Sequence, residues 1–155
     1  MQYTPQQVMA TVGISQQTLR YWRKVLPPLS DRDGYKACFS FADLVALKVT
    51  YLLANEAGVA VGTISKMSQA IFSACTVNAP LASGYYATLT ICPGSGKVVR
   101  SPRDKGLNAE ELEIVVPLGK CIEELLEALQ ESGTATRQFA LPLPLAAVST
   151  KGRRP

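Results

Sequence analysis

The chain has 155 residues, of which 47% are hydrophobic and 18% are charged, a composition typical of a globular protein and not of a disordered one. Its net charge of +4 is unevenly distributed. Residues 1–75 carry seven Lys and Arg against four Asp and Glu, residues 76–131 carry five against eight, and residues 132–155 carry four against none. A basic first part and an acidic second part indicate two different roles.

The residue types that usually carry catalysis or bind metal are scarce. The chain has no histidine, and its four cysteines (Cys38, Cys75, Cys92 and Cys121) form no CxxC pair. We therefore expect no enzyme activity, no cofactor and no metal, although a site formed by Cys75, Cys92 and Cys121 remains an alternative. Since neither a secretory signal nor a run of about 18 apolar residues occurs, we expect a cytoplasmic protein with reduced thiols and no membrane contact.

The first helix is expected directly after Thr4, because a hydroxyl N-cap followed by Pro5 at the first helical position is a typical helix start. Gly13 ends this helix, since glycine adopts the positive φ of a tight turn without steric cost. Ser15 then caps a second helix, Gln16–Leu26, which stops at the two prolines that follow. Two helices joined by a tight turn predict a helix-turn-helix.

The second helix combines an apolar stripe with a polar, basic outer face. The stripe consists of Leu19, Trp22 and Leu26, spaced i, i+3 and i+7. Amide side chains near the helix start suit adenine edges in a major groove, and cations suit phosphate groups. The outer residues Gln16, Gln17, Arg20, Arg23 and Lys24 therefore predict a recognition helix for DNA. The alternative is an ordinary solvated face.

A small hairpin is expected after the recognition helix. Asp33-Gly34 is a dipeptide typical of a tight hairpin turn, because such a turn needs positive φ at both central positions. Arg32 and Lys36 would lie near the tip of this hairpin, as in a wing beside the recognition helix. An ordinary polar loop is the alternative.

Two further helices complete the first part. Ser40 is expected to cap the first of them, with Asp43 supporting the cap, and its apolar face continues to Ala54. A break at residues 55–58 precedes the second, Val61–Cys75, whose apolar residues complete a core.

Residues 3–75 resemble the winged helix-turn-helix domain of the MerR family of bacterial transcriptional regulators. The features that follow the family's order and spacing are Tyr3-Thr4, Val8, Gly13-Ile14-Ser15, Thr18-Leu19-Arg20-Tyr21-Trp22, Pro28, Gly34-Tyr35-Lys36, Phe39, and Asp43-Leu44 with Leu47. The resemblance implies that the second helix enters the major groove and that the wing contacts the DNA backbone. It also implies a distorted promoter with altered access for RNA polymerase.

Carried over to this chain, the resemblance assigns two classes of DNA contact. Base contacts fall on Gln16, Gln17 and Thr18. Contacts with the DNA backbone fall on Ser15, Arg20, Tyr21, Arg23, Lys24, Arg32, Tyr35 and Lys36. The chain departs from the family in carrying Arg23 where an acidic residue is usual, and in lacking the long dimerising helix that normally follows the domain.

The second part predicts a small α+β unit after a turn-rich linker at residues 76–84. Alternating residues and high β-propensity indicate strands at Tyr85–Cys92, Lys97–Ser101 and Leu112–Val116, followed by a helix, Leu118–Glu131. We therefore expect an α+β fold. A mainly α-helical winged domain (residues 1–75) is followed by a three-stranded antiparallel sheet with one helix (residues 85–131) and a flexible, basic, proline-containing tail (residues 132–155).

The helix Leu118–Glu131 carries an apolar stripe of Leu118, Ile122, Leu125 and Leu129. Packing on the sheet is favoured over a coiled coil, because the helix covers only two heptads. Since three short strands and one helix make a small unit, this part is expected to carry the dimer contact, which we assign to the same four residues. A small-molecule pocket near Tyr85 and Tyr86 is a further alternative to simple core packing.

The sequence thus predicts a DNA-binding transcriptional regulator that binds an inverted repeat as a homodimer, through the helix Gln16–Leu26 and the hairpin wing. The alternative is an interaction or architectural protein of the phage packaging or excision type, which shares the winged fold but regulates no promoter.

Overall fold

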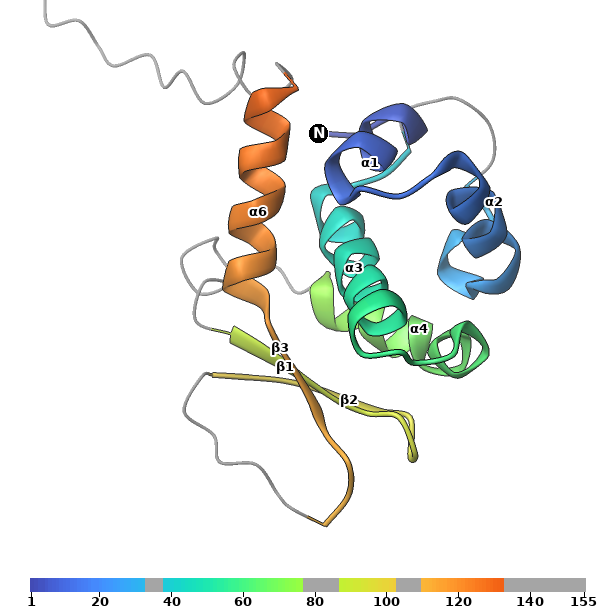
Figure 1. The fold of residues 1–155 in the computed structure, drawn as a ribbon, viewed down its shortest axis with the longest axis vertical. Helices are drawn as coiled ribbons and strands as arrows, with labels where there is room; N and C mark the ends of the chain where they lie inside the picture. Colours follow the sequence, from blue (N-terminus) through green and yellow to red (C-terminus); the bar gives the residue numbers. More distant parts are fainter. Residues whose placement is uncertain (33–37, 77–86, 103–109, 133–155) are drawn as a thin grey trace, which may run out of the picture.

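The computed structural model describes residues 1–32, 38–76, 87–102 and 110–132 (Figure 1). Helices and strands follow in the order α1 (Pro5–Val12), α2 (Gln16–Val25), α3 (Phe41–Tyr51), α4 (Val61–Cys75), β1 (Ala87–Cys92), β2 (Lys97–Pro102), β3 (Ile114–Pro117) and α6 (Leu118–Glu131). A 3-10 turn (Pro27–Leu29) follows α2, and a π-helical turn (Leu52–Glu56) follows α3. The predicted α+β class is confirmed. The hairpin tip, Tyr85, Tyr86, most of the linker and the tail beyond Ser132 lie outside the described residues.

Three helices begin at the predicted caps. The Thr4 hydroxyl accepts a hydrogen bond from the Gln7 backbone N–H at 3.3 Å, and the Thr4 N–H donates to the Gln7 side chain at 2.8 Å, which closes a capping box. Ser40 and Asp43 form the same arrangement at the start of α3. Gly13 ends α1 with φ 82°, in the left-handed region that glycine tolerates. These caps make the helix-turn-helix a consequence of local sequence.

The helix-turn-helix packs on the elements that follow it: α1 contacts α3, and α2 contacts α4 and the 3-10 turn. Leu19, Trp22 and Leu26 are almost fully buried, as their spacing predicts. The chain entering α1 is fixed by a bridge in which Tyr3 pairs with Phe39, with Tyr3 N–H donating to the Phe39 carbonyl at 2.7 Å. This bridge joins the start of the domain to the chain segment just after the predicted wing.

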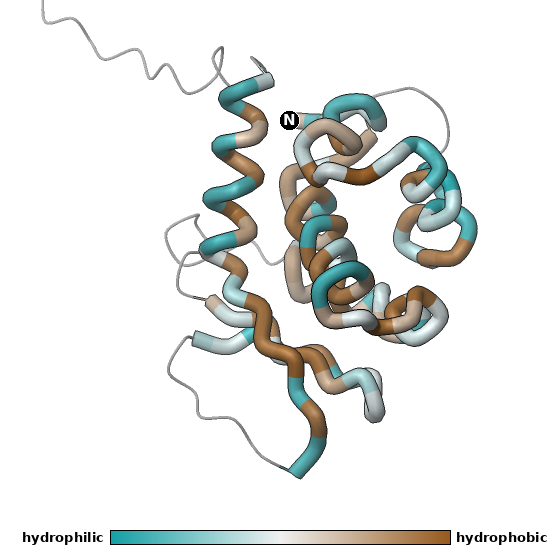
Figure 2. Tube along the Cα trace, viewed as in Figure 1, coloured by the Kyte–Doolittle hydropathy of each residue, from teal (hydrophilic) through white to brown (hydrophobic). Residues whose placement is uncertain are grey.

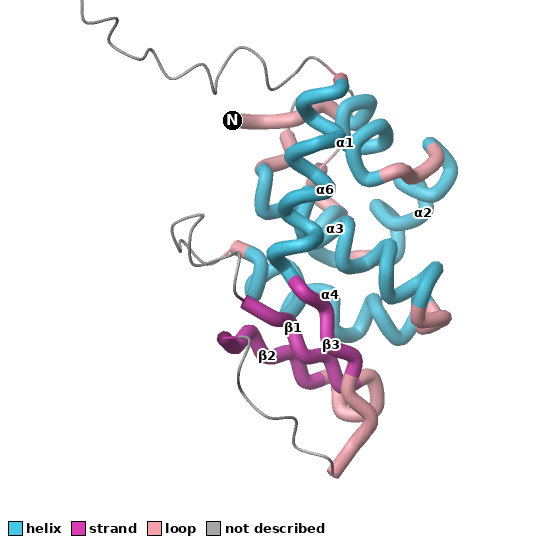
Figure 3. Tube along the Cα trace, turned by 60° about the vertical axis from the view of Figure 1, so that its left-hand side comes forward, coloured by secondary structure: helices cyan, strands magenta, loops and turns pink. Residues whose placement is uncertain are grey.

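The sheet has the strand order β2-β1-β3, and both pairings are antiparallel. In the described residues the first strand begins at Ala87, and the third runs from Ile114 to Pro117, two residues later than its predicted start. Leu89 and Ile91 are fully buried on one face of β1, and that face packs toward the helices (Figure 3). The predicted alternation is therefore present.

The helix α6 packs against α3, α1 and β1, so the two parts of the chain share one core. Hydrophilic residues of α6 lie mainly on its outer side (Figure 2). Two polar contacts tie the parts together: Lys48 Nζ lies 3.0 Å from Glu124 Oε2, and the Arg100 guanidinium donates to the Ala74 carbonyl at 3.1 Å. This packing places the acidic helix on the opposite side of α3 from α2.

The apolar stripe of α6 is occupied within its own chain. Its residues are between 0 and 7% exposed: Leu118, Ile122, Leu125 and Leu129. Their burial corrects the expectation that these four residues face a second copy, because a dimer contact through them would require α6 to leave the core. No helix in the described part of the chain is long and apolar enough to cross a membrane.

Candidate nucleic-acid interface

The outer face of α2 brings most of the predicted DNA-contacting residues together on one surface. Six of them are exposed, namely Ser15, Gln16, Gln17, Arg20, Tyr21 and Lys24, and two are half-buried, namely Thr18 and Arg23. Tyr21 is 50% exposed, so its ring and hydroxyl are accessible on this surface. The helix thus presents amides near its start and cations along its length.

The first turn of α2 is ordered by Ser15. Its hydroxyl accepts from the Thr18 backbone N–H at 3.1 Å and lies 2.9 Å from the Thr18 hydroxyl. This cap satisfies one of the free N–H groups at the helix start and fixes the Thr18 side chain beside Gln17. The polar tip of the helix therefore has a defined shape in the absence of a ligand.

Two arginines lie against the ring of Phe39. The guanidinium carbons of Arg23 and Arg32 lie 5.6 and 5.7 Å from the ring centroid, within the range of a cation–π contact. Arg32 also pairs with the buried Asp43 carboxylate and donates to the Cys38 carbonyl at 3.1 Å. The charge of Arg32 is therefore largely satisfied inside the protein, which makes it a weaker candidate for DNA contact than Arg20 or Lys24.

Open grooves flank α2 on both sides. A groove of about 600 Å³ lies between α1 and α2, and its lining includes Gln6, Gln16 and Arg20. A second groove of about 460 Å³ separates α2 from the end of α3, where Asn55 faces the side of the helix that carries Tyr21. Gln6 and Asn55 were not among the predicted contacts. For Gln6, its place on the polar side of the first helix is a signal that sequence alone provides.

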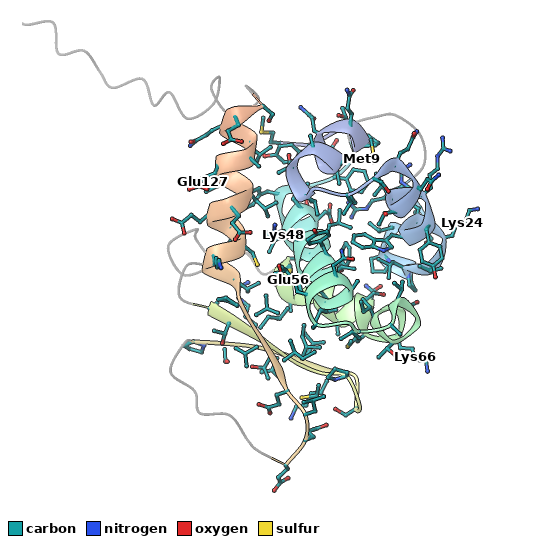
Figure 4. All side chains as sticks on the ribbon, in the orientation of Figure 1. Met9, Lys24, Lys48, Glu56, Lys66 and Glu127 are labelled. Carbon is teal, nitrogen blue, oxygen red and sulfur yellow. The ribbon has the colours of Figure 1, made fainter. Side chains whose placement is uncertain are left out.

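The outer face of α2 and the acidic helix α6 lie on opposite sides of the molecule. Figure 4 shows Lys24 pointing outward from α2 at one side and Glu127 on α6 at the other, with Lys48 pointing from α3 toward α6. No acidic residue occurs between Ser15 and Leu26. In the part of the chain that the structure describes, the acidic helix α6 therefore does not cover the basic face of α2.

The four cysteines are free thiols; Cys92 and Cys121 are buried, and Cys38 and Cys75 are half-buried. Burial raises the pKa of the Cys75 thiol to about 12 and that of Cys121 to about 11. Thiols with such pKa values stay protonated at neutral pH and are poor metal ligands. Within the described ranges, no cluster of three or more Cys, Asp or Glu side chains is arranged to hold a metal ion.

A comparison with protein families matches residues 3–71 to the family described as MerR HTH family regulatory protein. No curated protein matches the chain. The matched residues include α1, α2, α3 and most of α4, which are the elements that position the exposed face of α2. The match supports a DNA-binding regulator in general, and this family consists of regulators and not of enzymes. Residues 3–71 are therefore similar to the helix-turn-helix domain of MerR-type regulators.

Proposed function

We propose that this protein is a sequence-specific transcriptional regulator that inserts α2 into the major groove of duplex DNA. The observation that carries the proposal is the exposed, cation-bearing face of α2 within a MerR-type domain. An α-helix fits the width of the major groove, and amide side chains form paired hydrogen bonds with adenine. Base contacts are proposed for Gln16, Gln17 and Thr18, because they occupy the first turn of the helix, next to the cap.

Contacts with the DNA backbone are proposed for the residues that surround this first turn. Arg20 and Lys24 supply exposed positive charge, and the Tyr21 hydroxyl and the Ser15 hydroxyl supply uncharged donors. Arg23 adds a further cation at the edge of the same surface. From the predicted wing, Arg32, Tyr35 and Lys36 are proposed to extend the contact along the backbone, with Arg32 restricted by its ion pair with Asp43.

Selective binding is proposed to require two copies on an inverted repeat. A single domain of this size contacts only a few base pairs, and two-fold symmetry doubles the recognised sequence. The half-sites would lie one or two helical turns apart, at roughly 34–36 Å per turn. In this arrangement a bound dimer would change the shape of the DNA between the two half-sites.

A gel-shift assay with genomic fragments at two salt concentrations tests the proposal. Site-selective retention that weakens steeply as salt rises is the expected result, since each phosphate contact releases a counterion. A fragment lacking the selected site serves as the matched control. Equal retention of every fragment contradicts a sequence-specific regulator and favours an architectural protein, while no retention at either salt concentration contradicts DNA binding altogether.

A further inference from the structure

The face of the sheet that points away from the helices, here called the outer face, forms a grid of three rows. The register pairs Thr90 with Val99 on one side and with Val115 on the other, which defines the middle row. The residues two positions before and after Thr90 on β1, together with their partners on β2 and β3, form the rows on either side. The outer face consists of Thr88, Thr90 and Cys92 on β1, Lys97, Val99 and Ser101 on β2, and Val115 and Pro117 on β3, together with Glu113 one residue before β3.

The middle row is apolar and exposed. Val99 is 41% exposed and Val115 is 42% exposed, whereas Leu89 and Ile91 on the inner face are fully buried. Five large hydrophobic side chains are exposed in the described part of the chain, and three of them, Val99, Leu112 and Val115, belong to the sheet or its immediate approach. Figure 1 shows the helices on the other side of the sheet. No described helix therefore covers this row.

Opposite charges lie at the two ends of the next row. Lys97 is paired with Cys92, and continuing the register of β3 by one residue places Glu113 on the other side of Cys92. Consistent with this proximity, burial and the charges of Glu111 and Glu113 raise the pKa of the Cys92 thiol, and Lys97 lowers it. Lys97 and Glu113 lie two strand spacings apart, about 10 Å, and within the described residues neither forms an ion pair.

This pattern is complementary to itself. We propose that two copies of the chain associate face to face through their outer faces, about a two-fold axis parallel to β1. Such a rotation places β2 of one copy over β3 of the other. Lys97 then lies opposite the partner's Glu113, Val99 lies opposite the partner's Val115, and Thr90 lies on the axis opposite its own copy. The ion pair between Lys97 and the partner's Glu113 therefore forms twice, and the two sheets stack in the aligned arrangement of a β-sandwich.

The size of this surface sets the expected strength. Nine positions per copy are fewer than the 20–30 residues that a standard interface contributes per side, so the dimer is expected to be weak and to dissociate on dilution. Adjacent half-sites on DNA would raise the effective concentration of one copy near the other. The inference rests on the proposed function in one respect, namely that DNA binding requires two copies. The experiment that tests the interface contains no DNA. Failure of the dimer and failure of DNA binding are therefore distinguishable.

Charge reversal tests this interface in sedimentation experiments on the full chain between about 5 and 500 µM. Lys97→Glu places Glu opposite Glu, and Glu113→Lys places Lys opposite Lys, so each variant alone is expected to raise the dissociation constant by about tenfold or more. An equimolar mixture of the two variants restores both opposite-charge pairs and is expected to dimerise as the wild type does. The double variant, which carries both reversals, is expected to dimerise as well.

Matched controls separate this geometry from a general charge effect. Lys120→Glu and Glu127→Lys make the same charge changes at exposed positions of α6 and are expected to leave the dissociation constant unchanged. Far-ultraviolet circular dichroism confirms that each variant is folded. A wild-type chain that stays monomeric at 500 µM, single variants that dimerise normally, or a mixture that fails to recover dimers would each overturn the proposal. Recovery in the mixture supports it, because it requires Lys97 of one copy to lie close to Glu113 of the other.

Discussion

The Arg32 guanidinium pairs with the Asp43 carboxylate, and the same carboxylate oxygen accepts a hydrogen bond from the Ser40 backbone N–H at 2.7 Å. Asp43 is 6% exposed, so this one side chain both caps α3 and neutralises the cation next to the predicted wing. The start of α3 and the proposed DNA-binding surface near Arg32 therefore depend on the same buried carboxylate.

Asp43→Ala is expected to lower the free energy of unfolding by about 2 kcal/mol, because it removes the cap interaction and leaves Arg32 without its counter-charge. Urea denaturation measures this loss. Asp31→Ala, at an exposed position just after the 3-10 turn, is the control and should change stability by less than about 0.5 kcal/mol. Equal effects of the two substitutions would show that the Asp43 contacts contribute nothing specific.

Arg20→Ala is expected to weaken binding to every DNA sequence to a similar extent. Because an exposed guanidinium that contacts phosphate displaces a counterion, the slope of log affinity against log salt concentration should become shallower by about one. Binding titrations at four salt concentrations measure the slope. Lys120→Ala removes an equally exposed cation from α6 and should leave the slope unchanged, so a shallower slope in that variant would contradict the assigned surface.

Gln17→Ala is expected to change which sequences are preferred, with a cost of about 1–3 kcal/mol at the affected base pair and little effect on non-specific DNA. Competition between a selected site and its single-base variants measures the preference. An unchanged preference at every position of the site would exclude Gln17 from base recognition.

Leu125→Ala is expected to destabilise the whole chain by about 2–5 kcal/mol, since Leu125 is fully buried in the shared core. Trp22, the only tryptophan, lies in α2 and provides a fluorescence probe in the other part of the chain. If the two parts fold as one unit, the denaturation midpoint reported by Trp22 falls in this variant. Leu112→Ala, at a side chain that is 75% exposed, is the control. If the denaturation midpoint reported by Trp22 is the same in Leu125→Ala as in the wild type, the two parts unfold independently.

High pH is expected to destabilise the fold through its buried thiols. The pKa values of Cys75 and Cys121 are raised by burial to about 12 and about 11, from an ordinary value of 9.0. Below pH 9 both thiols are protonated in the folded and the unfolded chain. Above it, only the unfolded chain loses the protons, so the free energy of unfolding falls by at most about 1.4 kcal/mol per pH unit and thiol. Denaturation at pH 8 and pH 10 should show a smaller loss for the double variant Cys75→Ala and Cys121→Ala than for the wild type. An equal loss would contradict this origin.

The local elements were predictable because their signals are local. Ser15, Ser40 and the pair Thr4-Pro5 mark helix starts by their own chemistry, and the bounds of α4 and α6 agree with the structure to the residue. The π-helical turn at Leu52–Glu56 was not predictable, since no propensity rule distinguishes it from a frayed helix end.

The shared core was missed because it depends on contacts between distant segments. The stripe of α6 is equally suited to a second copy and to α3, and periodicity alone does not choose between them. A signal did exist in the sequence: five of the six residues Leu44–Val49 are apolar, and a helix that is apolar nearly all round must be covered on more than one side. At the candidate site, sequence predicted the exposed cations of α2, but the internal pairing of Arg32 required the position of Asp43 in space.

Selection of bound sites from a pool of random duplexes tests the central claim most directly, because it asks whether the face of α2 reads sequence without assuming a target. The account predicts that the wild-type chain enriches an inverted repeat, and that the Gln17→Ala chain enriches a repeat with altered half-sites. Recovery of sequences no different from the starting pool would contradict it.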